Sequence, residues 1–238
     1  MAARQQDAAS RTTPDGRTTR WAAHRARRRE QLIDAALEVL EEHGPDFGMN
    51  QVAARAGVTK PVVYRHFGDR MGLVDAMGDR ATNLLMSRLM PALFADDAPL
   101  VRIRSMLEAF LGFVAESPNV YWFFARRTPE GRDVVGADKS FVADALRSVL
   151  AEYLRTVDPA ADQIAAVWAR GAVGFVLNTA EWWLESREVA REDVVSHLTT
   201  LLWAQVDGMA RHYGVELDPQ RPISVDEIER NRRSGRGA

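Results

Sequence analysis

The chain has 238 residues with no cysteine, 46% hydrophobic residues and a formal net charge of −2. This length suits one or two domains with a hydrophobic core, and the lack of cysteine excludes a disulfide framework and thiolate chemistry. Because the sequence contains no run of 18 uncharged apolar residues, and its Arg-rich beginning has no apolar stretch, we expect no transmembrane helix, no signal peptide and no membrane partner.

Charge is distributed unevenly along the chain. Residues 1–70 carry 12 Lys and Arg against 9 Asp and Glu, a net charge of +3, whereas the remainder carries 19 against 24, a net charge of −5. A basic N-terminal part favours binding to phosphates. Ordinary fluctuation of charge along a soluble chain is the alternative interpretation.

Residues 1–23 are predicted to form a disordered basic arm, because Ser, Thr, Pro, Gly and Arg dominate there and the apolar periodicity of a helix or strand is missing. Two interpretations of the arm are open: contact with a minor groove or with phosphates, or an unused solvated tail. A helix is predicted to follow from about residue 24 to residue 43. Ile33, Ala36, Leu37 and Leu40 form its apolar stripe, and Gly44 ends it.

Residues 50–70 have the pattern of two short helices joined by a sharp turn. Val52, Ala53 and Ala56 have the i, i+1, i+4 spacing of a buried face on a first helix over residues 50–56. Gly57 stands at the turn, where glycine adopts a positive φ without a Cβ penalty.

The second short helix is predicted to start after Thr59, which can cap it. Pro61 fits the first turn, where a missing N–H costs nothing. Val62 and Val63 are expected to point back at the first helix. The remaining side chains are therefore expected to face outward: Lys60, Tyr64, Arg65 and His66. Such a pair of closely crossing helices is the unit that docks in a DNA major groove.

The string GVTKPVVYRHFGDR at residues 57–70, preceded by MNQVAARA, resembles the DNA-binding domain of the TetR family of bacterial repressors. Tyr64, His66, Phe67 and Arg70 match that family's pattern. One departure is Gly48, which stands where the family commonly has a Thr that caps the first helix and touches phosphate; Asn50 is expected to supply part of that contact. The resemblance implies a DNA surface of Asn50, Thr59, Lys60, Pro61, Tyr64, Arg65, His66 and Arg70, with Lys60 as the candidate base-reading residue and Thr59, Tyr64, His66 and Arg70 on phosphates.

The rest of the chain is predicted to be helical as well. Helices are expected at about residues 70–90, 100–116, 119–127, 138–156, 160–186 and 192–213, with Pro91 and Pro99 bracketing a loop. No segment has the alternation of a strand, so we expect an all-α fold of about nine helices. The predicted domains are a helix-turn-helix unit over residues 24–70, a larger ligand-binding and dimerisation domain over residues 71–215, and a charged tail over residues 216–238.

The larger part carries no recognisable catalytic constellation. It has no Gly-rich phosphate loop, no HExxH motif, no Cys/His cluster and no Ser/His/Asp set, so we expect no enzyme, no metal and no cofactor.

Aromatic residues are dense in this part, and apolar aromatic cavities between helices are common small-molecule sites, although any one aromatic residue is more often plain core. The TetR resemblance implies a ligand sensor. The predicted ligand-binding residues are Phe110, Phe113, Tyr121, Trp122, Phe123, Phe141, Phe175, Asn178 and Trp182.

Spacing and aromatic placement in residues 109–127 and 168–208 also resemble TetR proteins that sense long-chain acyl groups. This weaker resemblance implies a lipid or acyl-CoA effector. Arg126 and Arg127 then lie near its polar end, or simply close a helix C-terminus as solvated charges.

Gly171 and Gly174 lie within the predicted helix at residues 160–186, where each glycine costs about 1 kcal/mol against Ala. This cost indicates close approach of another helix. The resemblance implies a four-helix dimer interface built from the last two long helices, and close packing inside one subunit is the alternative. A dimer is expected in any case, because one recognition helix reads only a few base pairs.

These observations predict a cytoplasmic, nucleoid-associated, ligand-responsive transcriptional repressor that binds palindromic double-stranded DNA as a homodimer. The expected effector is a hydrophobic small molecule such as a long-chain acyl-CoA or fatty acid, and the helix at residues 70–90 is expected to transmit its binding. The alternative is a DNA-binding regulator without a small-molecule ligand, controlled by a protein partner.

Overall fold

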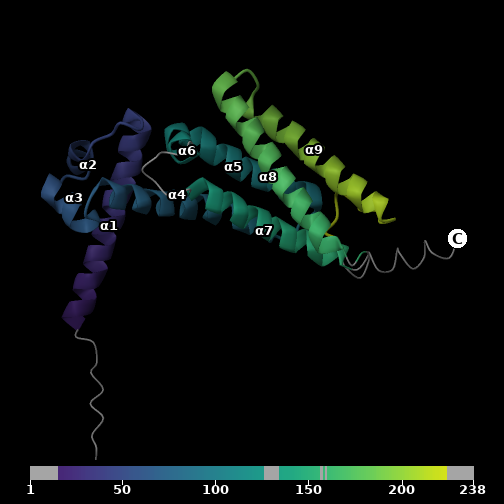
Figure 1. The fold of residues 1–238 in the computed structure, drawn as a ribbon, viewed down its shortest axis with the longest axis horizontal. Helices are drawn as coiled ribbons and strands as arrows, with labels where there is room; N and C mark the ends of the chain where they lie inside the picture. Colours follow the sequence, from purple (N-terminus) through teal and green to yellow (C-terminus); the bar gives the residue numbers. More distant parts are fainter. Residues whose placement is uncertain (1–15, 126–133, 156–157, 159, 224–238) are drawn as a thin grey trace, which may run out of the picture.

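The computed structural model describes residues 16–125, 134–155, 158 and 160–223, and within these residues the chain forms nine α-helices and no strand (Figure 1). The expectation of an all-α fold is confirmed. The helices are α1 (Gly16–His43), α2 (Met49–Arg55), α3 (Lys60–Phe67), α4 (Arg70–Leu93), α5 (Pro99–Glu116), α6 (Pro118–Ala125), α7 (Val134–Leu154), α8 (Ala161–Ser186) and α9 (Arg191–His212). No helix in the described ranges is long and apolar enough to cross a membrane.

Helices α1 to α3 form an N-terminal unit at one end of the molecule (Figure 1). Its core consists of side chains that the helical periodicity places on one face of each element. Leu32, Leu40, Val52 and Val63 are each completely buried there. The first turn of α4 packs on the same core, so α4 starts in the N-terminal unit and runs into the rest of the chain.

Helices α4 to α9 form a larger part, which we call the body. Helix α5 packs against α4 on one side and α9 on the other, and α7 lies along α8 (Figure 1). One hydrophobic core runs from Leu32 in α1 to Leu202 in α9 without interruption. The N-terminal unit and the body are therefore joined by buried contacts as well as by the chain.

The structure corrects the expected limits of three segments. Helix α1 begins at Gly16, so residues 16–23, which were expected in a disordered arm, are helical; the Arg and Ala residues there are good helix formers, which outweighed the polar composition. Residues 1–15 lie outside the described part. Pro91 lies inside α4 rather than in a loop, because a proline near a helix end removes only one hydrogen bond and already has a helical φ.

The third correction concerns the charged tail over residues 216–238, which was expected to be loose after Pro219. Its first part packs on the body: Leu217 and Ile223 contact a small cluster around Val215, and the Leu100 N–H donates to the Pro219 carbonyl at 3.4 Å. The apolar side chains at positions 217 and 223 give this segment surface to bury, which its charge alone does not suggest.

Candidate DNA-binding surface and ligand cavity

Helix α3 is held by its apolar face and by the turn before it. Val63 is fully buried and Phe67 nearly so, which fixes the orientation of the helix. Gly57 has φ +63°, the left-handed conformation expected at the turn, and the next N–H, of Val58, donates to the Ala53 carbonyl at 2.9 Å. Thr59 occupies the N-cap position with an extended backbone, but its side chain makes no capping hydrogen bond.

Most of the residues predicted to bind DNA are exposed on this unit. Asn50 and Thr59 are exposed, and so are the residues along the outer face of α3, Lys60, Pro61, Tyr64 and Arg65, whereas His66 and Arg70 are half-buried. The Nζ atom of Lys60 lies 5.8 Å from the centroid of the Tyr64 ring. These two side chains therefore lie together near the start of α3.

Gln51 plays a part that the sequence interpretation missed. Gly48 is the N-cap of α2, as expected, and its backbone N–H donates to Gln51 Oε1 at 2.7 Å. A Gln at the third position of a helix is a known capping partner, so the spacing from Gly48 to Gln51 was a readable signal. This bond satisfies the N–H of Gly48 itself, whereas a Thr hydroxyl at this position would accept from an N–H of the first turn.

Arg70 has contacts within the N-terminal unit. Its Nη2 donates to the Pro45 carbonyl at 3.0 Å, and the guanidinium lies 4.9 Å from the centroid of the Phe47 ring. The guanidinium thus holds the loop between α1 and α2 in place. Contact of Arg70 with phosphate stays a prediction.

Basic side chains of α1 extend the positive surface beside α3. The Arg29 guanidinium lies 5.0 Å from the centroid of the Phe67 ring, so α1 and α3 are in contact here. Partial burial of the His66 ring and the nearby positive charges of Arg65, Arg29, Arg28 and Arg25 lower the pKa of His66. A ring that feels four guanidinium groups lies in a strongly positive field, as a phosphate-binding surface requires.

A cavity of about 170 Å³ lies in the body. Its walls are almost entirely apolar and come from six helices. They include Ala81, Leu85 and Leu89 of α4, Ile103, Leu107, Phe110 and Phe113 of α5, Val120, Tyr121 and Phe124 of α6, Val142 and Leu146 of α7, Trp168, Ala172 and Val176 of α8, and Leu202 of α9.

Three of the predicted ligand residues line this cavity: Phe110, Phe113 and Tyr121. Phe124 and Trp168 line it as well and were missing from the prediction. The aliphatic wall residues on α4 and α5 have ordinary core periodicity, so no signal in the sequence separated them from core positions.

The other predicted ligand residues do not line the cavity. Phe141 and Trp182 are 56% and 47% exposed, Phe175 is exposed, and Asn178 lines a neighbouring cleft rather than the cavity. Trp122 is half-buried outside the cavity, and Phe123 packs against Phe47 with ring centroids 6.0 Å apart. Successive residues of a helix point about 100° apart, so Tyr121 to Phe124 cannot all face one cavity. Arg126 and Arg127 lie outside the described residues.

The cavity borders the joint between the N-terminal unit and the body. A groove at this joint, lined by Leu37 and Glu41 of α1 among others, shares Ala81, Phe113 and Val120 with the cavity wall. One residue each from α4, α5 and α6 therefore separates the cavity from the N-terminal unit.

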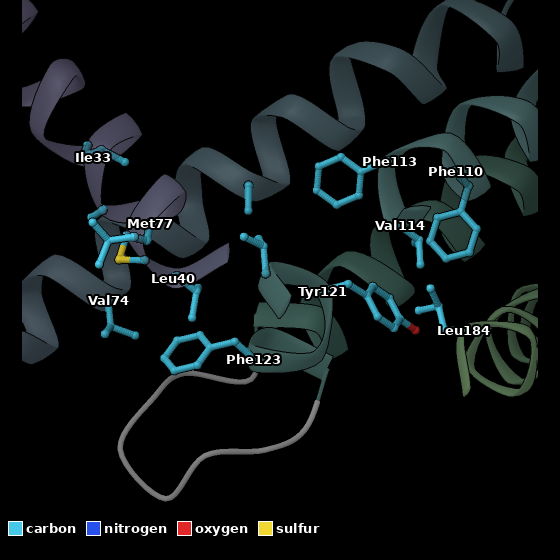
Figure 2. Close-up of a cluster of buried hydrophobic side chains, with 14 of the residues drawn as sticks. Ile33, Leu40, Val74, Met77, Phe110, Phe113, Val114, Tyr121, Phe123 and Leu184 are labelled. Carbon is cyan, nitrogen blue, oxygen red and sulfur yellow. The ribbon is translucent and has the colours of Figure 1, made fainter. Parts of the chain in front are cut away.

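Helix α6 bridges the two parts. Figure 2 shows Phe123 and Tyr121 leaving α6 in opposite directions, Phe123 toward Leu40 and Val74 and Tyr121 toward Leu184. The Tyr121 hydroxyl donates to Glu181 Oε1 of α8 at 3.0 Å, and burial together with the Glu181 charge raises the pKa of Tyr121. The phenol is therefore neutral and acts as a fixed hydrogen-bond donor.

An apolar strip remains exposed on α8 and α9 in the single subunit. Val167, Phe175 and Trp182 lie on one face of α8, with Val167 75% exposed, and Leu201 of α9 is 50% exposed. Within the described residues, and apart from the neighbouring residues and local backbone of α8 itself, no atom lies within 4 Å of a Cβ added at Gly171 or Gly174. Packing inside this subunit therefore does not account for the two glycines.

Comparison with known proteins identifies both parts of the chain. The family model described as "Bacterial regulatory proteins, tetR family" matches residues 32–77, and the one described as "Tetracyclin repressor-like, C-terminal domain" matches residues 88–216. In the described part of the chain, no group of three His, Cys, Asp or Glu side chains could hold a metal ion.

Two similar proteins span most of the chain. An uncharacterized HTH-type transcriptional regulator of Mycobacterium tuberculosis is 29% identical over 203 residues, which cover 84% of this chain and 86% of that protein. The HTH-type transcriptional activator FasR of Mycolicibacterium smegmatis is 28% identical over 181 residues, covering 75% of this chain and 83% of that protein.

Two solved structures share the fold. A tetR-family transcriptional regulator from Streptomyces coelicolor superimposes with a TM-score of 0.64 at 23% identity, covering 79% of this chain and 86% of that chain. The transcriptional regulator FadR from Bacillus subtilis, in complex with stearoyl-CoA, superimposes with a TM-score of 0.59 at 17% identity, covering 75% of this chain and 98% of that chain.

Proposed function

The chain belongs to the TetR family of bacterial transcriptional regulators, and from this premise we propose that it is a ligand-responsive repressor that binds palindromic operator DNA as a homodimer. The proposed effector is hydrophobic, such as a long-chain acyl-CoA or fatty acid, and releases the DNA. One observation carries this proposal: the apolar cavity shares wall residues with the groove beside the N-terminal unit.

The outer face of α3 supplies the contact with the operator. Lys60 at the start of the helix reads a base edge in the major groove, while the surrounding hydroxyl, imidazole and guanidinium groups bind phosphates. The positive field around His66 supports this assignment. Two copies of α3 about 34 Å apart then match the two half-sites of a palindrome.

The exposed strip of Val167, Phe175 and Trp182 on α8, with Leu201 on α9, is the proposed dimer interface. Large apolar side chains gathered on one face mark interaction sites in soluble proteins. Open space above Gly171 and Gly174 supports the same proposal, because a partner helix can approach the backbone closely there.

The cavity suits an apolar ligand, since nearly all of its wall is aliphatic or aromatic. FadR from Bacillus subtilis, which shares the fold, was solved in complex with stearoyl-CoA, and this supports an acyl effector for the present chain. The cavity volume of about 170 Å³ lies below the roughly 300–1,000 Å³ of typical ligand sites. A long acyl chain therefore needs the walls to move apart as it enters.

This movement is the proposed switch. Pressure on Ala81 moves α4, which follows α3 after only two residues. Pressure on Val120 moves α6, which contacts α1 and the loop that follows α1. Both routes displace the two recognition helices relative to each other. Because ligand and DNA then favour different states of one dimer, each weakens binding of the other by the same factor.

The test is operator affinity with and without effector. An operator is first selected from random duplexes, and its binding is measured by fluorescence anisotropy in the presence of palmitoyl-CoA, palmitic acid and neutral apolar compounds. We expect one of them to weaken binding by about 5- to 150-fold. If operator affinity stays constant with every compound, a regulator without a small-molecule ligand explains the protein better.

A matched pair of variants ties the effect to the cavity. Ala172→Leu fills space between α8 and the opposite wall and should abolish the response to the effector or weaken DNA binding without it. Ala190→Leu makes the same change at an exposed position before α9 and should leave the response unchanged. If the effector changes operator affinity equally in both variants, it binds outside the cavity.

Repression is tested with a reporter gene whose promoter overlaps the selected operator. Loss of the regulator should raise expression, and the effector should do the same in its presence. A fall in expression on loss of the regulator would assign activation instead, the activity named for the Mycolicibacterium smegmatis relative.

A further inference from the structure

The apolar cavity has a polar neighbour on the α7–α8 side. A cleft lined by Arg170, Asn178 and Glu181 of α8, among others, shares three residues with the cavity wall: Lys139, Val173 and Leu177. Lys139 thus stands at the boundary between an apolar space and a cleft with both polar and apolar walls. A molecule that fills both must have an apolar chain and a polar head.

At this boundary, Lys139 is a cation that makes no ion pair among the described residues. The chain has only two lysines, and the other, Lys60, lies in the N-terminal unit. The half-buried Lys139 makes no ion pair within 4.0 Å among the described residues, whereas Arg170 in the same cleft is paired with Asp144 at 3.6 Å. An ammonium group carries three donors and no acceptor, and it is stabilised when an anion accepts from it.

The other charged group in the cleft is already engaged. Glu181 accepts a hydrogen bond from the Tyr121 hydroxyl at 3.0 Å, which turns one carboxylate oxygen toward the body core. Among the described residues, Lys139 is thus the cation of this cleft that makes no ion pair, and the Asn178 amide lines the same cleft.

We propose that the cavity and the cleft form one site for an anionic amphiphile, in which the apolar chain fills the cavity and Lys139 binds a carboxylate or phosphate of the head group. This inference rests on the proposed effector function and assigns its head-group residue. The head group leaves the body between α7 and α8, so α7 and α8 carry the discrimination between charged and neutral lipids.

The experiment measures ligand binding to the full-length protein without DNA, by titration calorimetry. The probes are palmitic acid, palmitoyl-CoA and the neutral 1-hexadecanol. Lys139→Met keeps the length of the side chain but removes the charge, Lys139→Arg keeps the charge, and Arg104→Met removes an exposed cation of α5 as the matched control.

We expect Lys139→Met to weaken binding of an anionic probe by roughly tenfold or more, while Lys139→Arg and Arg104→Met retain most of the affinity. The affinity for 1-hexadecanol should be the same in all four proteins. If Lys139→Met loses affinity for palmitic acid, Lys139 binds the carboxylate. If it loses affinity only for palmitoyl-CoA, Lys139 binds a phosphate.

Two results overturn the inference and leave the proposed function intact. One is equal affinity of the wild-type protein for 1-hexadecanol and for both anionic probes. The other is an equal loss for charged and neutral probes in Lys139→Met, which would give Lys139 a packing role only. If no probe binds the wild-type protein, the proposed effector fails together with the inference.

Discussion

Glu41 accepts two hydrogen bonds from Asn119 across the boundary between the N-terminal unit and the body. The Asn119 N–H donates to Glu41 Oε2 at 3.0 Å, and Asn119 Nδ2 donates to the Glu41 carbonyl at 2.7 Å. The next N–H, of Val120, donates to the same Oε2 at 3.1 Å. A carboxylate from α1 thus caps the first turn of α6, where free N–H groups and the helix dipole favour negative charge.

This cap couples the position of α6 to that of α1. Burial raises the pKa of Glu41, although the hydrogen bonds from Val120 and Asn119 act in the opposite direction. We predict that Glu41→Ala lowers the free energy of unfolding by about 1 kcal/mol through lost hydrogen bonds, and that it reduces the effect of ligand on operator affinity. Urea denaturation and anisotropy titrations measure the two effects.

Glu41→Gln is the control for the cap, because its amide oxygen still accepts from the α6 backbone. It should retain most of the stability and most of the ligand response. If Glu41→Ala keeps the full ligand response, the signal passes through α4 alone.

Lys60 is the residue proposed to read a base edge of the operator. We predict that Lys60→Ala costs about 1–3 kcal/mol of operator binding and relaxes the preference at one base pair of each half-site. Selection from random duplexes before and after the change measures the preference. Arg104→Ala is the matched control, since it removes an exposed cation of α5 in the body and should leave DNA binding unchanged. Equal losses on operator and random DNA would assign Lys60 to a phosphate.

Operator binding should depend on pH through His66. Burial and neighbouring arginines lower the pKa of its ring in the free protein, and a phosphate against the ring would raise that pKa in the complex. Binding then takes up a proton, so affinity should increase as the pH falls from 8 toward 6, by at most about tenfold per pH unit. Anisotropy at constant ionic strength measures the slope.

His66→Gln should remove this slope, and His43→Gln, a change at an exposed histidine at the end of α1, should keep it. A slope that persists in His66→Gln would show that another group takes up the proton.

The exposed strip on α8 predicts the oligomeric state. Trp182→Glu places a charge in the proposed interface and should convert the dimer to monomers in sedimentation velocity experiments, with a loss of operator affinity because a monomer reads one half-site. Phe94→Glu, at an even more exposed aromatic residue just beyond the end of α4, should remain dimeric. Dimers of unchanged stability in Trp182→Glu would place the interface on another face.

The local features of the N-terminal unit were predictable from the sequence. The turn at Gly57, the buried position of Val63 and the exposed position of Tyr64 depend on residues only a few positions apart, and helical periodicity relates them directly. The cap of α2 by Gln51 was encoded at the same short range. Arg70 was predictable only in part, because its contacts with Pro45 and Phe47 depend on a loop 25 residues away.

Composition and periodicity thus determined the all-α class, the recognition helix and the presence of an aromatic-rich body. The tertiary structure alone decided the division of α6, with Tyr121 and Phe124 in the cavity and Phe123 on the N-terminal unit, and it placed Trp182 and Phe141 outside the cavity. Residues 78 positions apart, such as Glu41 and Asn119, meet only when helices pack. Burying an aromatic ring is favourable against any apolar neighbour, so the sequence specifies that such a ring is buried and the packing of helices specifies where.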